Sequence, residues 1–151
     1  MLKIFKTKDV KTPVREGLNA GFDFFVPKSH RTIFLNPNES IAIESGIKVN
    51  IPKDHVLIAF NKSGIAIKNN LQIGACVIDE NYQGEICLHV TNIGQEAQCI
   101  KGNMKLVQFV LLPIKYHEVE EWKDEGSMYQ DWSENKKLER GDQGFGSTNR
   151  K

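Results

Sequence analysis

The sequence predicts an all-β protein, a sandwich or barrel of short strands. Apolar runs of about four to eight residues, rich in Val, Ile and Phe, recur from residue 21 to residue 114. Gly, Pro and Asn separate these runs, as in the turn signal Asn36-Pro37-Asn38. A helical repeat of about 3.6 residues is not sustained anywhere before residue 115. A chain of 151 residues is long enough for one domain with its own core, so residues 1–151 are expected to form a single domain.

The expected strands combine apolar residues with flanking turn residues. In chain order they are Gly21–Pro27, Thr32–Leu35, Ser40–Glu44, Ile47–Ile51, Val56–Phe60, Cys76–Ile78, Glu85–Thr91 and Leu106–Ile114. Gly46 is expected to separate the third strand from the fourth. Asn61–Asn70 is expected to form one short helix. The polar turn 79–84 lies between two apolar runs and predicts a β-hairpin with Asp79 and Tyr82 at its mouth.

Charge and cysteine content exclude several classes of protein. Lys and Arg number 20 against 19 Asp and Glu, and a net charge of +1 gives no support for binding nucleic acid. The three cysteines form no CxxC pattern and are expected to be reduced, in an intracellular compartment. The N-terminus has no signal-peptide pattern, and no apolar run approaches the roughly 18 residues of a membrane span. We therefore expect a cytoplasmic protein that binds neither nucleic acid nor membranes.

Residues 115–139 differ from the rest of the chain in composition. They hold eight acids against four lysines, a net charge of −4, with Tyr116, Trp122 and Trp132 among them. We expect an insertion that runs over the surface and is held down by its aromatic side chains, or else a docking segment for a protein partner. Residues 140–151 carry three bases and one acid and are expected to form a mobile C-terminal lid.

The C-terminal segment has the composition of a phosphate-binding loop. Gly141, Gly144 and Gly146 allow backbone N–H groups to converge, and Arg140 adds a guanidinium. The segment is not a P-loop, which needs GxxxxGK and then Ser or Thr between a strand and a helix. A glycine-rich terminus without a ligand is the simpler interpretation. Phe145 nevertheless favours docking, with a planar base as one candidate.

Two further segments suit a nucleotide site. Lys62-Ser63-Gly64 precedes the expected helix, where backbone N–H groups favour an anion, although a simple N-cap is the alternative. Asp79 follows an apolar run, where a carboxylate can deprotonate water, although it can equally satisfy the N–H groups of a turn. Asp23, at the edge of an apolar strand, can likewise have a functional or a purely structural role. Its functional role would be to hold Mg²⁺ through water, as carboxylates near a triphosphate often do.

Taken together and in order, these segments resemble the five motifs of the homotrimeric dUTPase family. The matching segments, with the family patterns in parentheses, are Ala20–Asp23 (AGxD), Lys62–Ala66 (RSGLA), Gly74–Glu85 (GxGVIDxDYRG), Gly102–Gln108 (GDRIAQ) and Arg140–Thr148 (RGxGGFGST). The resemblance covers the chain from Ala20 to its end, except for 115–139, which is longer than the usual connection in the family. Five motifs in one order are a far more specific signal than any one of them.

The resemblance implies a jelly-roll-like β barrel assembled as a homotrimer, with active sites between subunits. It implies the hydrolysis of dUTP to dUMP and pyrophosphate with Mg²⁺, which keeps uracil out of DNA and supplies dUMP for dTMP synthesis. Asp79 would activate the water that attacks the α-phosphorus. Tyr82 would lie against the deoxyribose and exclude a 2′-hydroxyl. The uracil edge would be read by backbone groups of Ile73, Gly74 and Ile78.

The resemblance places the other site residues around the phosphates. Asp23 would contact a Mg²⁺-bound water. Phosphate contacts would come from Lys62, Ser63, Gly64 and Gln108. Another subunit would supply the lid, with Phe145 over the uracil, Arg140, Ser147 and Thr148 at the γ-phosphate, and Gly146 among the substrate contacts.

The sequence departs from the family patterns at several positions. Lys62 stands in place of Arg, which keeps the charge but loses bidentate geometry. Asn103 and Met104 stand in place of the Asp-Arg pair of the fourth motif, which is expected to remove an ion pair. Gln143 replaces a Gly of the fifth motif.

Two other functions are alternatives. The related dCTP deaminase group shares the fold, but the IDxxY run around Asp79 and the complete C-terminal motif favour the dUTPase. A regulatory protein that is gated by a nucleotide and binds its partner through residues 115–139 is the alternative from a different class.

Overall fold

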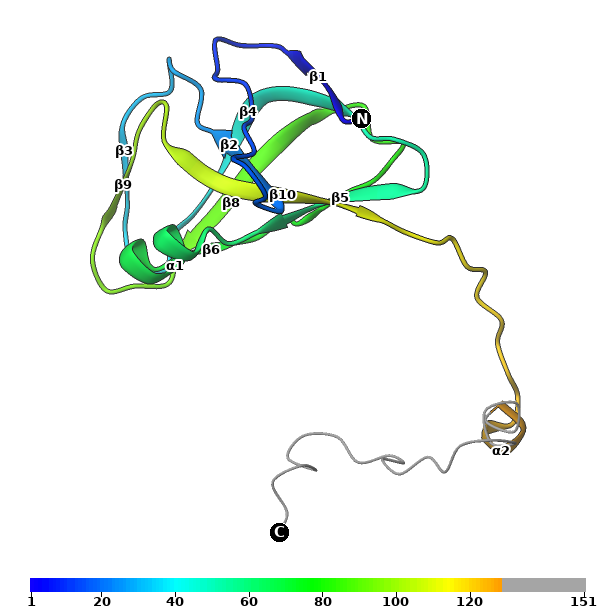
Figure 1. Cartoon of the computed structure of the whole chain (residues 1–151). Coiled ribbons are helices and arrows are strands. Elements are labelled where there is room, and N and C mark those ends of the chain that lie inside the picture. The colour runs from blue at the N-terminus through cyan, green and yellow to red at the C-terminus, as the bar shows by residue number, and fades with distance from the viewer. Residues whose placement is uncertain (129–151) are drawn as a thin grey trace. The chain divides into compact units, whose positions relative to one another are not determined.

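Short strands and one helix make up residues 1–116 in the computed structural model, which describes residues 1–128 (Figure 1). In chain order the elements are β1 (Lys3–Lys6), β2 (Gly21–Phe25), β3 (Ile33–Leu35), β4 (Ser40–Asn50), β5 (His55–Phe60), α1 (Ser63–Asn69), β6 (Leu71–Ile73), β7 (Val77–Ile78), β8 (Glu85–Asn92), β9 (Gln98–Ile100) and β10 (Lys105–Pro113). Residues 117–151 are a separate unit, in which α2 (Glu125–Met128) is described.

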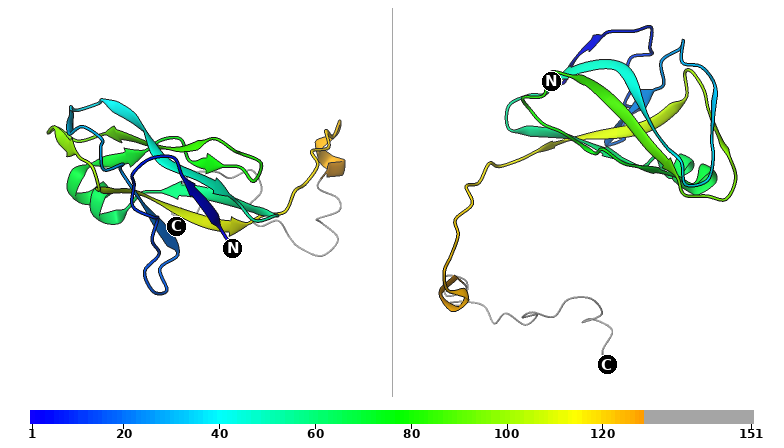
Figure 2. Two further views of the ribbon diagram at one scale, coloured as in Figure 1. Left: turned by 90° about the horizontal axis from the view of Figure 1, so that it is seen from above. Right: turned by 180° about the vertical axis from the view of Figure 1, so that it is seen from behind.

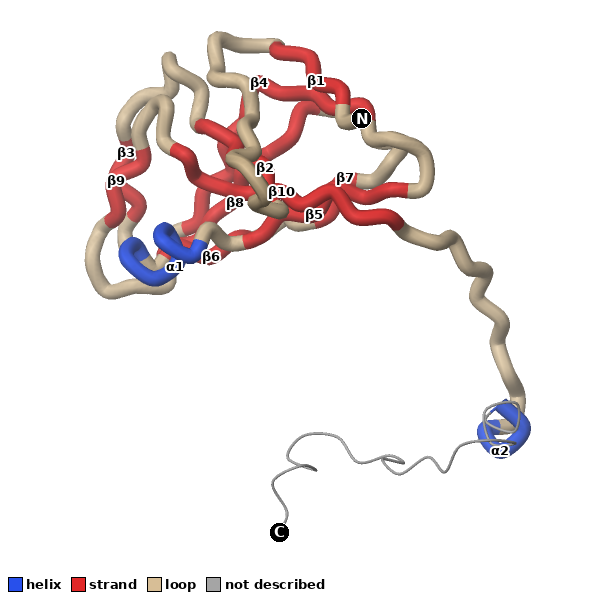
Figure 3. Tube along the Cα trace, viewed as in Figure 1, coloured by secondary structure: helices blue, strands red, loops and turns tan. Residues whose placement is uncertain are grey.

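The strands form two four-stranded sheets and one small sheet (Figure 3). The strand orders are β1-β4-β8-β6 and β2-β10-β5-β7, with β3 and β9 paired separately. Every pairing between these strands is antiparallel. The sheets curve around a common interior (Figure 2). The expected all-β, jelly-roll-like sandwich with one short helix is therefore confirmed.

The core follows from the alternation of apolar side chains along the strands. In β8, every second residue from Ile86 to Asn92 is buried, which is the period of a strand with one face on the interior. Phe24 of β2 and Phe109 of β10 are fully buried with ring centroids 4.6 Å apart. Burying a side chain of this size stabilises the fold by about 1.5–3 kcal/mol. The central pair therefore fixes β2 and β10, the strands that carry Asp23 and Gln108.

Most predicted strands are confirmed, with small changes in their bounds. Gly46 does not end a strand, as the sequence analysis had predicted: β4 is continuous, and its register shifts between Glu44 and Lys48, where Gly46 has φ +74°. A bulge of this kind adds a residue without ending the ladder. β1, β6 and β9 were not predicted, because each is only three or four residues long and includes polar residues.

The predicted β-hairpin around the turn 79–84 is wrong. Ile78 of β7 pairs with Leu57 of β5, whereas β8 pairs with β4 and β6. The turn therefore carries the chain from one sheet to the other. Two apolar runs on either side of a polar turn do not by themselves determine whether they pair with each other. Here β5 offers a free edge to β7, so Asp79 lies beside β5.

The predicted helix Asn61–Asn70 is confirmed as α1, Ser63–Asn69. Lys62 precedes it with extended backbone angles, and Asn70 ends it in the left-handed conformation that favours Asn or Gly. No helix in residues 1–128 is long and apolar enough to cross a membrane. The predicted lid 140–151 and most of the second half of the segment 115–139 lie outside the described residues.

Candidate functional site

A pocket of about 510 Å³ lies beside the start of α1 and collects side chains from three predicted motifs. Its lining includes Asp23 from β2, Lys62, Ser63 and Gly64 around the start of α1, and Gln108 from β10. The register that pairs Gln108 with Asp23 on one side and with Phe60 on the other brings these segments together. The structure therefore gathers in one pocket five of the residues that the sequence analysis had selected.

Asp23 lies between two lysines in this pocket. Lys62 Nζ is 2.5 Å from Asp23 Oδ1, and Lys105 Nζ is 3.1 Å from Asp23 Oδ2. The side chains of Asp23 and Lys62 are only 16% and 24% exposed, so solvent screens this pair less than a surface pair. Lys105 also contacts Glu16 at 2.9 Å, and the carboxylates of Glu16 and then Asp23 raise the pKa of Lys105. Asp23 thus orients two ammonium groups, of which that of Lys62 lines the pocket.

Lys105 was missed in the sequence analysis, and it corrects one expectation. Counting back from Gln108 through the pattern GDRIAQ, Lys105 falls on the Arg and Asn103 on the Gly. Asn103 has φ +65°, a left-handed conformation that favours glycine, which supports this register. The cation of the fourth motif is therefore retained as Lys105, which pairs with Asp23 of the first motif, while Met104 stands in place of the Asp.

Asn61 is a second residue that the sequence analysis missed. Gln108 Nε2 donates to the Asn61 carbonyl oxygen at 2.7 Å, and Asn61 Oδ1 accepts from the Ile73 N–H at 3.0 Å. Asn61 therefore orients the amide of Gln108 and joins the pocket to the segment 73–78. No sequence signal marks it, because its contact to Gln108 uses a backbone carbonyl that any residue has.

Ile73, Gly74 and Ile78 lie in a segment whose backbone is already partly paired. The Gly74 N–H donates to the His89 carbonyl oxygen at 3.1 Å. A Cβ at position 74 would lie 1.6 Å from His89 Nδ1, so only glycine fits there. The N–H groups of Ile73 and Gly74 are thus used inside the chain, and Ile78 belongs to the ladder with β5. Contact of this segment with a base stays a prediction.

Asp79 lies elsewhere, in a pocket of about 830 Å³ that shares no lining residue with the first. The pairing of Ile78 with Leu57 sets Asp79 level with Val56, at the start of β5, whereas Lys62 follows the end of β5. At about 3.3 Å per strand residue, Asp79 and Lys62 are about 20 Å apart along this strand. The structure does not bring Asp79 to the phosphate-type pocket of the same chain.

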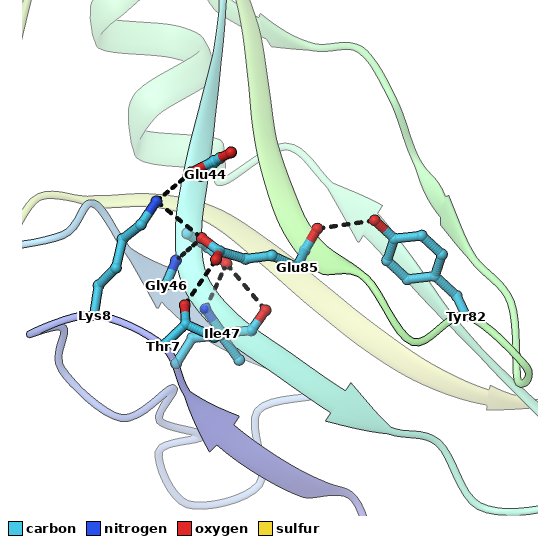
Figure 4. Close-up of polar contacts among 8 residues, drawn as sticks. Thr7, Lys8, Glu44, Gly46, Ile47, Tyr82 and Glu85 are labelled. Atoms are coloured by element: carbon cyan, nitrogen blue, oxygen red, sulfur yellow. Dashed lines mark hydrogen bonds and ion pairs between the residues drawn. The ribbon is translucent and has the colours of Figure 1, made fainter.

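Tyr82 is held in place by the start of β8 (Figure 4). Its hydroxyl donates to the Glu85 carbonyl oxygen at 3.0 Å, and its N–H donates to the Asp79 carbonyl oxygen at 3.1 Å. A Cβ at Gly84 would lie 2.2 Å from the Tyr82 hydroxyl oxygen, so glycine at this position makes room for the ring. The turn therefore fixes the ring of Tyr82 relative to the backbone of Asp79.

The Glu85 side chain anchors that turn to the rest of the sheet (Figure 4). Its carboxylate accepts from the Thr7 hydroxyl and the Gly46 N–H, both at 2.7 Å, and lies 3.2 Å from Lys8 Nζ. Lys8 also pairs with Glu44. Burial raises the pKa of Glu85, but the hydrogen bonds from Thr7 and Gly46 and the contact with Lys8 outweigh this and hold it below its ordinary value.

Mg²⁺ was predicted to bind through water at Asp23, and the chemistry of this residue fits that role. An ionised carboxylate has about four lone-pair sites, of which the two lysines occupy one on each oxygen. Asp23 can therefore still accept a hydrogen bond from a metal-bound water. Residues 1–128 contain no group of three or more His, Cys, Asp or Glu side chains arranged to hold a metal. Such an ion would be held mainly by phosphate oxygens, as Mg²⁺ often is.

The predicted lid residues cannot be placed. Arg140, Phe145, Gly146, Ser147 and Thr148 all lie outside the described residues. Their roles stay predictions that come from the fifth motif alone.

The depressed pKa of Glu85 predicts a pH-dependent contribution to stability. A carboxyl whose pKa is lowered by folding stabilises the folded protein at pH values above its pKa in the unfolded chain, here 4.5. This contribution is lost as the pH falls through the pKa of the folded state. Glu85→Gln should therefore lower the urea midpoint at about pH 7, and the gap from wild type should shrink below about pH 4.5. Urea unfolding over a pH series measures this. An equal gap at every pH would contradict the assignment.

Comparisons with known proteins agree with the motifs. The dUTPase family model matches residues 8–149. The chain is 35% identical over 135 residues to the deoxyuridine 5'-triphosphate nucleotidohydrolase of Clostridium kluyveri, covering 86% of this chain and 83% of that protein. It is also 36% identical over 133 residues to the Pol polyprotein of equine infectious anemia virus (strain Wyoming), covering 86% of this chain and 10% of the polyprotein.

Solved structures of phage enzymes share the fold. The dUTPase from phage phi11 of S. aureus superimposes with a TM-score of 0.75 at 22% identity, covering 82% of this chain and 97% of that one. A variant of the Staphylococcus bacteriophage 80alpha dUTPase with dUpNHpp gives a TM-score of 0.81 at 22% identity, covering 97% of each chain. The predicted enzyme class, a dUTP diphosphatase of nucleotide metabolism, is confirmed by the family match and the curated relatives. By that match over residues 8–149 and that identity to a curated relative, this chain belongs to the dUTPase family.

Proposed function

We propose that this protein hydrolyses dUTP to dUMP and pyrophosphate, with Mg²⁺ as cofactor and a water molecule attacking the α-phosphorus. The observation that carries the proposal is the pocket beside α1, which is lined by Asp23, Lys62 and Gln108, with Lys105 as a second cation on Asp23. Family membership supports the choice of dUTP, because the curated relative is named as a deoxyuridine triphosphate nucleotidohydrolase. The cellular role would be to keep uracil out of DNA and to supply dUMP for dTMP synthesis.

The pocket beside α1 would bind the triphosphate. Lys62 Nζ has three N–H donors and uses one on Asp23, which leaves two for phosphate oxygens. Ser63 and Gly64 add a hydroxyl and a backbone N–H, and Gln108 adds an amide already oriented by Asn61. Donors fixed in advance stabilise charge that develops on a transferred phosphoryl group. Bound Mg²⁺ would neutralise further phosphate charge, with Asp23 accepting from one of its waters.

Asp79 would act as the general base. Its carboxylate is exposed and faces a pocket with room for substrate. It would take a proton from water as the water oxygen bonds to the α-phosphorus, and the bond from that phosphorus to the bridging oxygen would break to release pyrophosphate. Tyr82, held against the same turn, would lie against the deoxyribose and leave no space for a 2′-hydroxyl.

A complete site requires a second copy of the chain. Asp79 and Lys62 are about 20 Å apart along β5, too far to serve one α-phosphorus. We therefore place Asp79 of one subunit next to Lys62 of another in a homotrimer with active sites between subunits. Arg140, Phe145, Gly146, Ser147 and Thr148 would close the site, also from a different subunit.

A secondary proposal concerns the segment 115–139 as a docking site for a protein partner. In its described part, Val119 and Trp122 are 98% and 44% exposed among acidic residues. The Staphylococcus bacteriophage 80alpha dUTPase has been described as controlling transfer of virulence genes. At 22% identity, the likeness of this chain to that phage enzyme shows a shared fold alone and does not itself support a shared partner.

Substrate selectivity tests the principal proposal. Pyrophosphate release should be fast with dUTP and Mg²⁺, and much slower with UTP, dTTP or dCTP, because in the proposed site Tyr82 would exclude a 2′-hydroxyl and the backbone around Gly74 would read the uracil edge. Omitting Mg²⁺ should slow the reaction. Ammonia release from dCTP would instead indicate the deaminase alternative. Absence of pyrophosphate release from all four nucleotides would remove the proposed function.

Subunit mixing tests the shared site. Asp79→Asn and Lys62→Ala should each lose most turnover, since general bases typically contribute about 10²–10⁴-fold. Refolded together, the two variants should regain activity, because a site can then combine a native Lys62 with a native Asp79 in about a quarter of random pairings. Asp9→Asn, at an exposed carboxylate, is the matched control and should stay active. A mixture as inactive as its components would argue against a site shared between subunits.

The docking segment has its own test. Replacing Val119 and Trp122 together with Ser should leave dUTP turnover unchanged if these side chains serve a partner, because neither belongs to the two pockets. Steady-state kinetics measures this directly. A large loss of turnover would place the segment in the enzyme site or in contacts between subunits.

A further inference from the structure

We propose that Glu80 and Tyr116 are positioning residues for Asp79, holding the catalytic turn against the end of the barrel. This inference rests on the proposed role of Asp79 as general base. Neither residue was selected for the site from the sequence, where Tyr116 was grouped with the acidic segment. In the structure Tyr116 is the last residue of the barrel unit.

One carboxylate oxygen joins three segments of the chain. Glu80 Oε2 accepts from the Tyr116 hydroxyl and from the Asp54 N–H, each at 2.8 Å. The Asp54 carbonyl oxygen in turn accepts from the Ile114 N–H at 2.9 Å. The catalytic turn, the β4–β5 connection and the end of β10 are therefore linked in one hydrogen-bonded ring. Hydrogen bonds to an ionised acceptor are stronger than those between neutral groups.

Asp79 needs such support because its own strand is weakly held. β7 has only two residues and lies at the edge of its sheet, where it pairs with β5 alone. Within the turn, the Tyr82 N–H donates to the Asp79 carbonyl oxygen, and the Tyr82 hydroxyl donates to the Glu85 carbonyl oxygen. Glu80 is the next residue after Asp79, so fixing its side chain fixes the backbone from which the Asp79 carboxylate projects. A general base must lie within hydrogen-bond reach of its water.

A tyrosine as the partner of Glu80 also suits the role of Asp79 as a general base. Hydrogen bonding to Glu80, burial, and the charges of Glu80, Asp54 and Asp79 all raise the pKa of Tyr116, so it remains a neutral donor. A lysine at this place would add a second cation to the Lys53 that already lines this pocket, and a nearby cation lowers the basicity of a carboxylate. Within residues 1–128 the Asp79 carboxylate has no side-chain hydrogen bond of its own. Its lone pairs are thus left for water.

The experiment compares steady-state kinetics of dUTP hydrolysis among four variants of the full chain. Glu80→Ala should lower kcat by about tenfold or more, since small misplacements of a reacting group are costly. KM should change less than kcat, because Glu80 has no proposed contact with the nucleotide and the phosphates would be bound by residues of another subunit. Glu80→Gln should restore kcat, because its amide oxygen can accept both hydrogen bonds. Tyr116→Phe should lose less, and combining it with Glu80→Ala should add nothing further.

Controls separate positioning from folding and from the proposed function. Glu96→Ala, at an exposed carboxylate outside both pockets, should keep wild-type kinetics. Hydrogen exchange of peptides covering residues 79–84 should be faster in Glu80→Ala than in wild type, a readout that needs no catalysis. If the wild type hydrolyses dUTP and the Glu80→Ala variant has the same kcat and the same hydrogen exchange as the wild type, the positioning role is overturned. If the wild type does not hydrolyse dUTP but hydrogen exchange in the turn is faster in Glu80→Ala than in the wild type, the proposed function is overturned and the structural role of Glu80 in holding the turn is supported.

Discussion

The pairing of β5 with β10 on one edge and β7 on the other determines how far Asp79 lies from the pocket of Lys62 and Gln108. β10 brings Gln108 level with Phe60, next to Lys62, while β7 brings Asp79 level with Val56. A hydrogen-bonded strand cannot shorten, so the two halves of the site stay about 20 Å apart within one chain. In the proposed function the site is therefore shared between two copies of the chain, for a reason that lies in strand register and not in surface composition.

The pocket beside α1 combines charges of both signs, which the total charge of the chain does not show. Lys62 lines the pocket with Asp23 and Glu16, and Lys105 contacts both of these carboxylates. The two carboxylates offset the charge of the two lysines, and Asp23 fixes the direction of both ammonium groups. An ammonium fixed before substrate arrives needs no reorganisation when charge develops, which is the main way enzymes stabilise phosphoryl transition states. The near-neutral composition gives no support for nucleic-acid binding, and it is compatible with a local nucleotide site.

The sequence predicted the strands with continuous apolar runs, such as Val56–Phe60, because burial on one or both faces leaves a direct mark on composition. It could not predict the partners of β7, because an apolar run does not encode which edge it joins. Among site residues, Lys105 could have been found by counting back from Gln108, with Asn103 as the glycine-like position. Asn61 and Tyr116 could not have been found in this way. The Asn61 carbonyl contacts Gln108 and the Tyr116 hydroxyl contacts Glu80, and only folding brings these groups together.

The two departures from arginine in this chain are linked by geometry. Lys62 and Lys105 both stand where the family patterns have Arg, and both contact Asp23. A guanidinium pairs with a carboxylate through two parallel N–H groups, whereas an ammonium is a point charge with three donors that rotate. Lys105 uses two donors, on Asp23 and Glu16, and Lys62 uses one. In the proposed function, Lys62 would therefore bind the phosphates more than Lys105, which would chiefly hold Asp23 in place.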